Sequence, residues 1–203
     1  MNESFLQLAS ARQNQIQNAA MKVFSQSPYR KASTDDIAAS AGISKGLLFY
    51  HFRNKKELYT DLYRYCCERI YEEIKRIEAW KEPDFFERNR LVVEARFNAA
   101  EQTPYLLAFG LRAYYETDPA VCSEISQINA DILADGLTVL TEGVDTSSFR
   151  NREDISRAIK LIAWLGDGLI RERMEESLPD MSALKQEVFQ YFELMKHGFY
   201  CKE

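Results

Sequence analysis

Apolar residues recur three and four positions apart along nearly the whole chain. Ile16, Ala20, Val23 and Phe24, for example, form one apolar stripe of a helix that ends near Ser27-Pro28. Alternating apolar and polar runs bounded by Asn-Gly or Asp-Gly turns, which are typical of β-hairpins, do not occur in the sequence. The pattern therefore predicts an all-α fold.

The breaks between the stripes contain proline or clusters of Gly, Ser and Asp, which are residues that end helices. They divide the chain into about nine predicted helices. After the first helix and two short helices between residues 33 and 52, the predicted ranges are 55–80, 84–102, 104–116, 119–142, 150–177 and 181–200.

Charge is distributed unevenly along the 203 residues, whose net charge is −5. Through residue 58, eight basic residues against four acidic ones give +4, and the remainder carries −9. Such asymmetry indicates a basic head that binds a polyanion and an acidic body with another task, although a chance distribution of solvated charge gives the same numbers.

The sequence lacks the residue patterns that are typical of several functional classes. No apolar run approaches the roughly 20 residues that span a bilayer, and the start MNESFLQLAS lacks the features of a signal peptide, so we expect a cytoplasmic protein without a membrane partner. The four cysteines and two histidines show no metal or nucleophile–base spacing, which predicts no metal, no cofactor and no enzymatic activity. A redox sensor at Cys66-Cys67 stays open.

The segment KASTDDIAASAGISKGLLFYHFRNKKEL, residues 31–58, has the signals of a helix-turn-helix. Ser33 or Thr34 is a predicted N-cap, and Ser33-x-x-Asp36 fits a capping box. Gly42 supplies the tight turn, and Ser44 caps the next helix. Two short helices joined in this way place the second one in the major groove of DNA, amino-terminal end first.

The predicted DNA contacts lie on and after this second helix. Gly46 permits close approach of the backbone, Lys45 can reach a guanine edge or a phosphate, and Leu48 can contact a thymine methyl group. Ser44, Tyr50 and His51 extend this surface, and Lys55 is predicted to clamp the flanking phosphates. The competing interpretation places Leu48, Tyr50 and His51 in the domain core and leaves Lys55 solvated.

Residues 10–60 resemble the amino-terminal DNA-binding domain of the TetR family of transcriptional regulators. The resemblance rests on Ser33-Thr34, Ile37-Ala38, Ala41-Gly42-Ile43-Ser44, Lys45-Gly46, Tyr50-His51-Phe52 and Asn54-Lys55-Lys56-Glu57-Leu58. It implies that Ile37, Ala38, Ile43 and Phe52 are core residues. It also implies that the DNA contacts are Thr34, Ser44, Lys45, Gly46, Tyr50, His51 and Lys55.

Two positions depart from the family pattern. Phe49 stands where the family usually has a tyrosine, so a phenolic hydroxyl that could bind phosphate is missing. Asp35 and Asp36 place negative charge near the expected DNA backbone and weaken phosphate binding there.

The resemblance implies two domains, a DNA-binding domain over residues 1–58 and a helical ligand-binding and dimerisation domain over residues 59–203. Aromatic residues crowd the middle helices and are candidate walls of an effector pocket, although such stripes are usually ordinary core. The candidates for ligand binding are Trp80, Phe97, Tyr105, Phe109, Tyr114 and Trp164.

By the same resemblance the last two helices form the dimer interface, as a four-helix bundle with their mates. Apolar stripes on both helices fit this arrangement, and they fit equally a core inside one subunit. The predicted interface residues are Ile159, Gly166, Ile170, Val188, Tyr191 and Met195.

The expected function is a homodimeric regulator, most simply a repressor, that binds a palindromic operator in double-stranded DNA. A small apolar or aromatic effector would release it by favouring a conformation with wrongly spaced DNA-binding heads. The alternatives are a helical protein-interaction adaptor and an enzyme, each with a vestigial helix-turn-helix.

Overall fold

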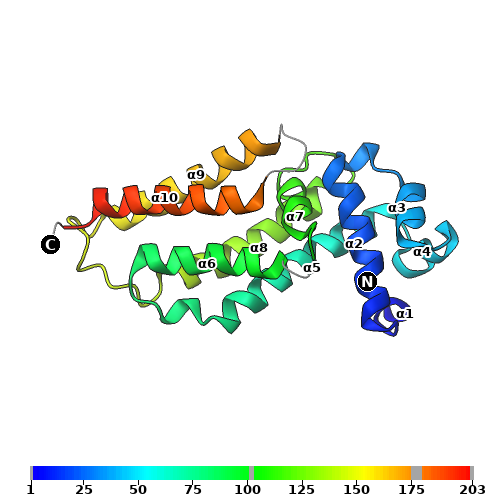
Figure 1. The fold of residues 1–203 in the computed structure, drawn as a ribbon, viewed down its shortest axis with the longest axis horizontal. Helices are drawn as coiled ribbons and strands as arrows, with labels where there is room; N and C mark the ends of the chain where they lie inside the picture. Colours follow the sequence, from blue (N-terminus) through cyan, green and yellow to red (C-terminus); the bar gives the residue numbers. More distant parts are fainter. Residues whose placement is uncertain (1, 101–102, 175–179, 202–203) are drawn as a thin grey trace. The chain divides into compact units, whose positions relative to one another are not determined.

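A computed structural model of the chain describes residues 2–100, 103–174 and 180–201. Within these ranges it contains ten α-helices, two 3-10 helices and no strand, which confirms the all-α prediction (Figure 1). In chain order they are α1 (Glu3–Leu6), α2 (Ser10–Gln26), η1 (Tyr29–Lys31), α3 (Thr34–Ala41), α4 (Lys45–Phe52), α5 (Lys55–Arg76), η2 (Ala79–Lys81), α6 (Phe85–Ala100), α7 (Leu106–Tyr114), α8 (Cys122–Thr141), α9 (Asp154–Met174) and α10 (Met181–Phe199).

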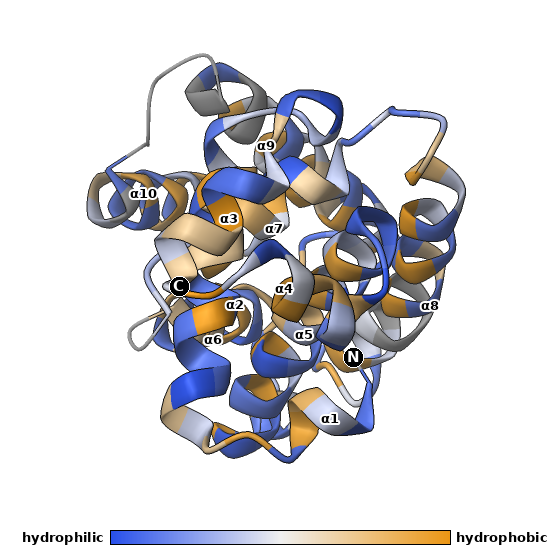
Figure 2. Ribbon diagram, turned by 90° about the vertical axis from the view of Figure 1, so that its right-hand side faces the viewer, coloured by the Kyte–Doolittle hydropathy of each residue, from blue (hydrophilic) through white to orange (hydrophobic). Residues whose placement is uncertain are grey.

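The chain packs into two compact units. The first contains residues 1–70 and 99–132, and the second contains residues 71–98 and 133–203. Helices α5, α6 and α8 each contribute residues to both units. The helices of both units carry hydrophobic residues, drawn orange, and hydrophilic residues, drawn blue, as expected for helices with one buried face (Figure 2). The functional boundary between residues 58 and 59 stays a prediction.

Aromatic rings hold the core of the first unit together. The ring of Tyr59 in α5 meets Phe24 of α2 at 4.8 Å and Phe109 of α7 at 5.1 Å, both edge to face. All three side chains are fully buried. In addition, Arg112 Nε donates to the carbonyl of Ser25 at 2.9 Å, so α7 is fixed to the end of α2 by packing and by a hydrogen bond.

The second unit has a core built from α6, α9 and α10, in which the last two helices lie side by side (Figure 1). The rings of Phe85 and Phe86 pack against Phe149, which precedes α9. Ala158 and Phe192 complete the buried set. Buried aromatic rings of this size contribute large apolar areas, so this cluster explains why the carboxyl-terminal helices stay attached to α6.

A buried arginine closes the second unit at the end of α8. Only 1% of Arg88 is exposed, and its guanidinium donates to the carbonyls of Glu82 at 2.6 Å, Glu142 at 2.6 Å and Val139 at 3.2 Å. Burial lowers the pKa of Arg88. The last carbonyls of a helix have no hydrogen-bond partner within it. The guanidinium donates to these carbonyls at the end of α8, and the same hydrogen bonds replace those that Arg88 would make with water.

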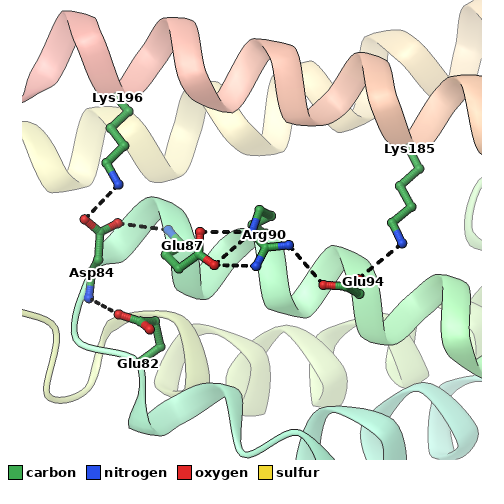
Figure 3. Close-up of polar contacts among 7 residues, drawn as sticks. All are labelled: Glu82, Asp84, Glu87, Arg90, Glu94, Lys185 and Lys196. Carbon is green, nitrogen blue, oxygen red and sulfur yellow. Dashed lines mark hydrogen bonds and ion pairs between the residues drawn. The ribbon is translucent and has the colours of Figure 1, made fainter.

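A row of ion pairs joins α6 to α10 (Figure 3). Asp84, just before α6, pairs with Lys196 at 3.2 Å. Further along α6, Glu94 binds both Arg90 at 3.0 Å and Lys185 at 3.5 Å. Because these side chains are partly exposed, the ion pairs contribute little to stability. Their main effect is to align α6 with α10.

The predicted helix ranges need two corrections. The long helix ends at Arg76 and not at residue 80, because Glu78 takes a left-handed conformation with φ of 51° and η2 follows. The helix α1 was not predicted at all. None of the helices in the described ranges combines the length and hydropathy needed to cross a membrane.

Candidate DNA interface

Local capping builds the helix-turn-helix of α3 and α4 as predicted from the sequence. Ser33 Oγ accepts from the backbone N–H of Asp36 at 3.2 Å, and Ser44 Oγ accepts from that of Leu47 at 3.1 Å. Gly42 adopts φ of 62° and ends α3 in the left-handed conformation that favours glycine. These caps fix the point at which α4 begins.

The two sides of α4 differ completely in exposure. Leu48, His51 and Phe52 are buried in the first unit. The exposed residues of the helix and its cap are Ser44, Lys45, Gly46, Leu47 and Tyr50. The exposed residues begin at the helix amino terminus, where free backbone N–H groups favour a phosphate, so this face has the arrangement of a DNA-reading surface.

Leu48 does not belong to that surface. Its side chain is fully buried in the domain core, and the predicted contact with a thymine methyl group is therefore wrong for this residue. The apolar run Leu47-Leu48-Phe49 gave no period from which the exposed position could be chosen. The structure places Leu47 outside, with 40% of its surface exposed.

His51 is also enclosed, which corrects its prediction as a surface contact. Only 3% of it is exposed, and its Nδ1 lies 3.0 Å from Ser4 Oγ. The rings of Phe5 and Phe52 approach its imidazole at 5.8 Å and 6.4 Å. Burial lowers the pKa of His51, so the imidazole is neutral near pH 7 and is unsuited to bind phosphate by charge.

The unpredicted helix α1 is what covers His51. Asn2 Oδ1 caps α1 by accepting from Phe5 N at 3.0 Å, and Asn2 Nδ2 donates to the carbonyl of Tyr50 at 2.6 Å. Phe5 is fully buried against the ring of Phe52 at 4.8 Å. The amino-terminal residues therefore support the carboxyl-terminal end of α4, a role that sequence periodicity cannot reveal in a four-residue helix.

Lys45, at the start of α4, is held by an ion pair. Its Nζ lies 2.9 Å from Asp35 Oδ2, and the two side chains are 49% and 69% exposed. A pair that is open to water contributes little to stability, so a phosphate or base could replace the carboxylate at low cost. Thr34, the first residue of α3, directly precedes Asp35 in the sequence and is half-buried.

The remaining predicted contacts differ in availability. Tyr50 is 64% exposed, and its ring meets that of His51 edge to face at 5.4 Å. Lys55 is half-buried, because its Nζ donates to the carbonyl of Arg30 at 3.4 Å and lies 4.7 Å above the ring of Tyr29. Burial lowers the pKa of Lys55, against the smaller opposite effect of Asp118 and Glu116. Contact of either residue with DNA stays a prediction.

Comparison with known proteins supports this interpretation of the surface. Residues 16–62 match the model of the family described as bacterial regulatory proteins, tetR family. This range includes α3, α4 and both caps.

The chain belongs to the TetR family. It is a DNA-binding transcriptional regulator, and the family match and the regulators to which it is similar favour this function over an adaptor or an enzyme.

Similarity to individual TetR-type regulators extends beyond the helix-turn-helix. The fatty acid metabolism regulator protein of Bacillus subtilis is 25% identical over 195 residues, covering 93% of this chain and 95% of that protein. The HTH-type transcriptional activator FasR of Mycolicibacterium smegmatis is 30% identical over 114 residues, covering 56% and 52%. The solved structure of the fatty acid degradation regulator FadR from Bacillus halodurans covers 88% of this chain and 96% of its own, with TM-score 0.68 and 22% identity, and shows the same fold.

The aromatic residues predicted to bind a ligand in this TetR-family chain are divided between the two units. Tyr105, Phe109 and Tyr114 lie in the first unit, where Phe109 is fully buried core and Tyr114 is 51% exposed. Trp80, Phe97 and Trp164 lie in the second unit. Trp80 is 40% exposed and Trp164 is 67% exposed, so neither ring is enclosed by the chain itself.

The predicted dimer stripe turns mostly inward. Ile159, Val188 and Met195 pack against the buried cluster of Phe85, Phe86, Phe149, Ala158 and Phe192. All three side chains are only partly buried, so their place in the dimer interface stays a prediction. The side chain of Ile170 lies outside the described residues.

Other large apolar side chains of α9 and α10 are exposed. Leu161 and Trp164 of α9 are 40% and 67% exposed, and Tyr191 and Leu194 of α10 are 39% and 68% exposed. These four residues, called the outer strip below, include Tyr191 from the predicted interface set. A Cβ added to Gly166, another predicted interface residue, would meet nothing within 4 Å, so the chain's own packing does not require a glycine there.

The adjacent thiols have different environments. Cys66 is buried and its Sγ lies 3.6 Å from Met21 Sδ, and burial raises the pKa of the Cys66 thiol. A protonated, enclosed thiol is a poor nucleophile, which argues against Cys66 as a redox sensor. Cys67 is half-buried, and the hypothesis rests on it alone.

Proposed function

We propose that this TetR-family protein is a repressor that binds a palindromic operator as a homodimer and leaves it when an apolar effector binds. The observation that carries the proposal is the division of α4 into a buried side and an exposed side that starts at a capped helix terminus. Ser44, Lys45 and Gly46 stand on the exposed side, where a major groove would meet them.

In this proposal residues 1–58 bind DNA, and residues 59–203 bind the effector and form the dimer. Charge supports this division, because the first segment carries +4 and the second −9. Phosphate binding by the basic segment is salt-dependent, whereas the acidic body stays away from DNA by repulsion.

A second copy of the chain covers the outer strip in this proposal. Four large apolar side chains that are each at least 39% exposed, on two neighbouring helices, are more than scattered surface leucines. A two-fold interface uses the same patch on both subunits, so one strip suffices for both partners. The two DNA-binding heads would then face two half-sites with the same symmetry.

The effector class follows from the relatives. The names of the Bacillus subtilis protein and of the Bacillus halodurans structure refer to fatty acid metabolism and degradation. We infer that this chain regulates genes of fatty acid metabolism and responds to a ligand with a long apolar chain. Among the predicted aromatic residues of the second unit, Trp80 and Phe97 are the proposed contacts for this ligand, whereas Trp164 belongs to the outer strip.

Selection of sequences from random double-stranded DNA by the purified protein tests the operator. The expected product is an inverted repeat whose half-sites lie about one helical turn apart or a multiple of it. Recovery of no preferred sequence, or of a single asymmetric site bound by a monomer, would contradict the proposal. A series of fatty acids of increasing chain length, added to the bound complex, tests release.

A further inference from the structure

The exposed side of α4 offers few hydrogen bonds for reading bases. Residues 44–52 are Ser-Lys-Gly-Leu-Leu-Phe-Tyr-His-Phe and include no Arg, Asn, Gln, Asp or Glu. Those are the side chains that read guanine, adenine and cytosine edges, most often in pairs of hydrogen bonds. With His51 buried, Lys45 and Tyr50 are the polar side chains left to enter a groove beyond the cap. Base recognition by this helix must therefore depend largely on apolar contact.

Leu47 is placed for such a contact. It lies on the first turn of α4, and its backbone N–H is fixed by Ser44 Oγ at 3.1 Å. The side chain is 40% exposed, whereas the neighbouring Leu48 fills the core. Gly46, immediately before it, removes the side chain that would hold DNA at a distance, and Tyr50 follows three positions later on the same exposed side.

We propose that Leu47 determines specificity by packing against the methyl group of a thymine in each half-site. The proposal rests on the proposed operator binding by α4. The thymine methyl is the apolar group that base pairs present in the major groove, so it is the feature that an exposed leucine at this position can recognise. A cytosine at the same place leaves the leucine against a polar edge and costs affinity.

The test removes the methyl group from the DNA and leaves every hydrogen bond in place. In a duplex selected by the wild-type protein, each thymine is replaced in turn by deoxyuridine. The expected result is one position per half-site at which the dissociation constant rises about fourfold, which is the fold-change for burial of one such group. Substitution in both half-sites should raise it roughly 16-fold, since the two fourfold effects multiply.

The variant Leu47→Ala identifies the side chain responsible. It should bind the thymine and deoxyuridine duplexes with equal affinity, while Leu6→Ala, which truncates another exposed leucine in the same unit, should keep the wild-type preference. A methyl effect that persists in Leu47→Ala, or no methyl effect in a wild-type protein that binds its duplex, would overturn the assignment of Leu47. Failure of the wild-type protein to select any duplex would instead overturn the proposed operator binding. Unchanged thermal melting of Leu47→Ala establishes that the variant is folded.

Discussion

The ammonium group of Lys45 lies 2.9 Å from the carboxylate of Asp35, so an ion pair joins α3 to α4 on the exposed side of the helix-turn-helix. In the proposed complex the same ammonium group faces DNA. The carboxylate therefore competes with phosphate or base for Lys45, and it also adds negative charge at the interface. Lys45 therefore pairs with Asp35 in the free protein and with DNA in the proposed complex.

Removal of the competing charge should tighten DNA binding. We expect Asp35→Asn to lower the dissociation constant for the operator about fivefold per dimer, on the order of 0.5 kcal/mol per subunit, because an exposed pair is weak. Fluorescence anisotropy at low salt measures the change. Asp36→Asn is the matched control, since it removes the same charge one residue further along α3 and leaves the Lys45 pair intact. Equal affinities of the two variants would mean that the pair itself has no role.

Substitution of Gly46 should affect folding and DNA binding in opposite directions. A Cβ at this position would meet only Ser44 Oγ at 3.9 Å, an ordinary contact, so the fold accepts alanine. We expect Gly46→Ala to raise the free energy of unfolding by up to about 1 kcal/mol, because alanine favours helix. Operator binding should weaken by about 1–3 kcal/mol through crowding at the groove. Urea unfolding and anisotropy measure the two effects, and tight binding by a stabilised variant would remove Gly46 from the interface.

The outer strip should control the oligomeric state. Trp164→Ala and Leu194→Ala each remove a large side chain that is at least 67% exposed in the single chain, so folding of the monomer should be preserved. If a second copy covers them, the dimer should weaken by about 2 kcal/mol or more for each, as expected for central anchors. Sedimentation velocity measures the strength of the dimer. The control is Leu6→Ala, which truncates an exposed leucine of the first unit. Dimers of unchanged strength in both variants would place the interface elsewhere.

His51 should make stability depend on pH. The pKa of His51 in the folded chain lies below its ordinary value of 6.5, because burial disfavours the charged form. The unfolded chain therefore binds a proton first as pH falls, so this contribution to stability is present above pH 6.5 and is lost as pH falls toward the folded pKa. Urea midpoints at about pH 7.5 and about pH 5.5 should differ more for the wild type than for His51→Leu. Equal pH dependence would show that α1 does not enclose the imidazole in solution.

The sequence predicted the helix-turn-helix well because its signals are local. Ser33, Gly42 and Ser44 act on backbone groups within four residues of themselves, and the structure confirms each of them as a cap or a turn. The choice between Leu47 and Leu48 was beyond the sequence, since both are apolar neighbours and an eight-residue helix shows too few turns to define a period.

Long-range partners explain what else the sequence did not reveal. Phe5 and Asn2 find their partners in α4, more than 40 residues away, so the pattern of the amino-terminal residues gave no sign of α1. Ile159 and Val188 lie on genuine apolar stripes, but periodicity shows that a face is buried and not which surface covers it. The exposed strip of Trp164 and Leu194 emerges only once the inner face is known.

The most direct test of the account is the salt dependence of operator binding by Lys45→Ala, beside wild type and Lys22→Ala, a control that removes an exposed lysine of α2. If Lys45 neutralises one phosphate per subunit, the slope of log K against log salt should fall in magnitude by about 1.8 for the dimer. If it reads a guanine edge, discrimination at one base pair per half-site should fall by about 1–3 kcal/mol. Titrations on the selected operator and its single-base variants distinguish these results. A Lys45→Ala protein that matches Lys22→Ala in slope, affinity and discrimination would contradict the claim that the amino-terminal end of α4 binds DNA.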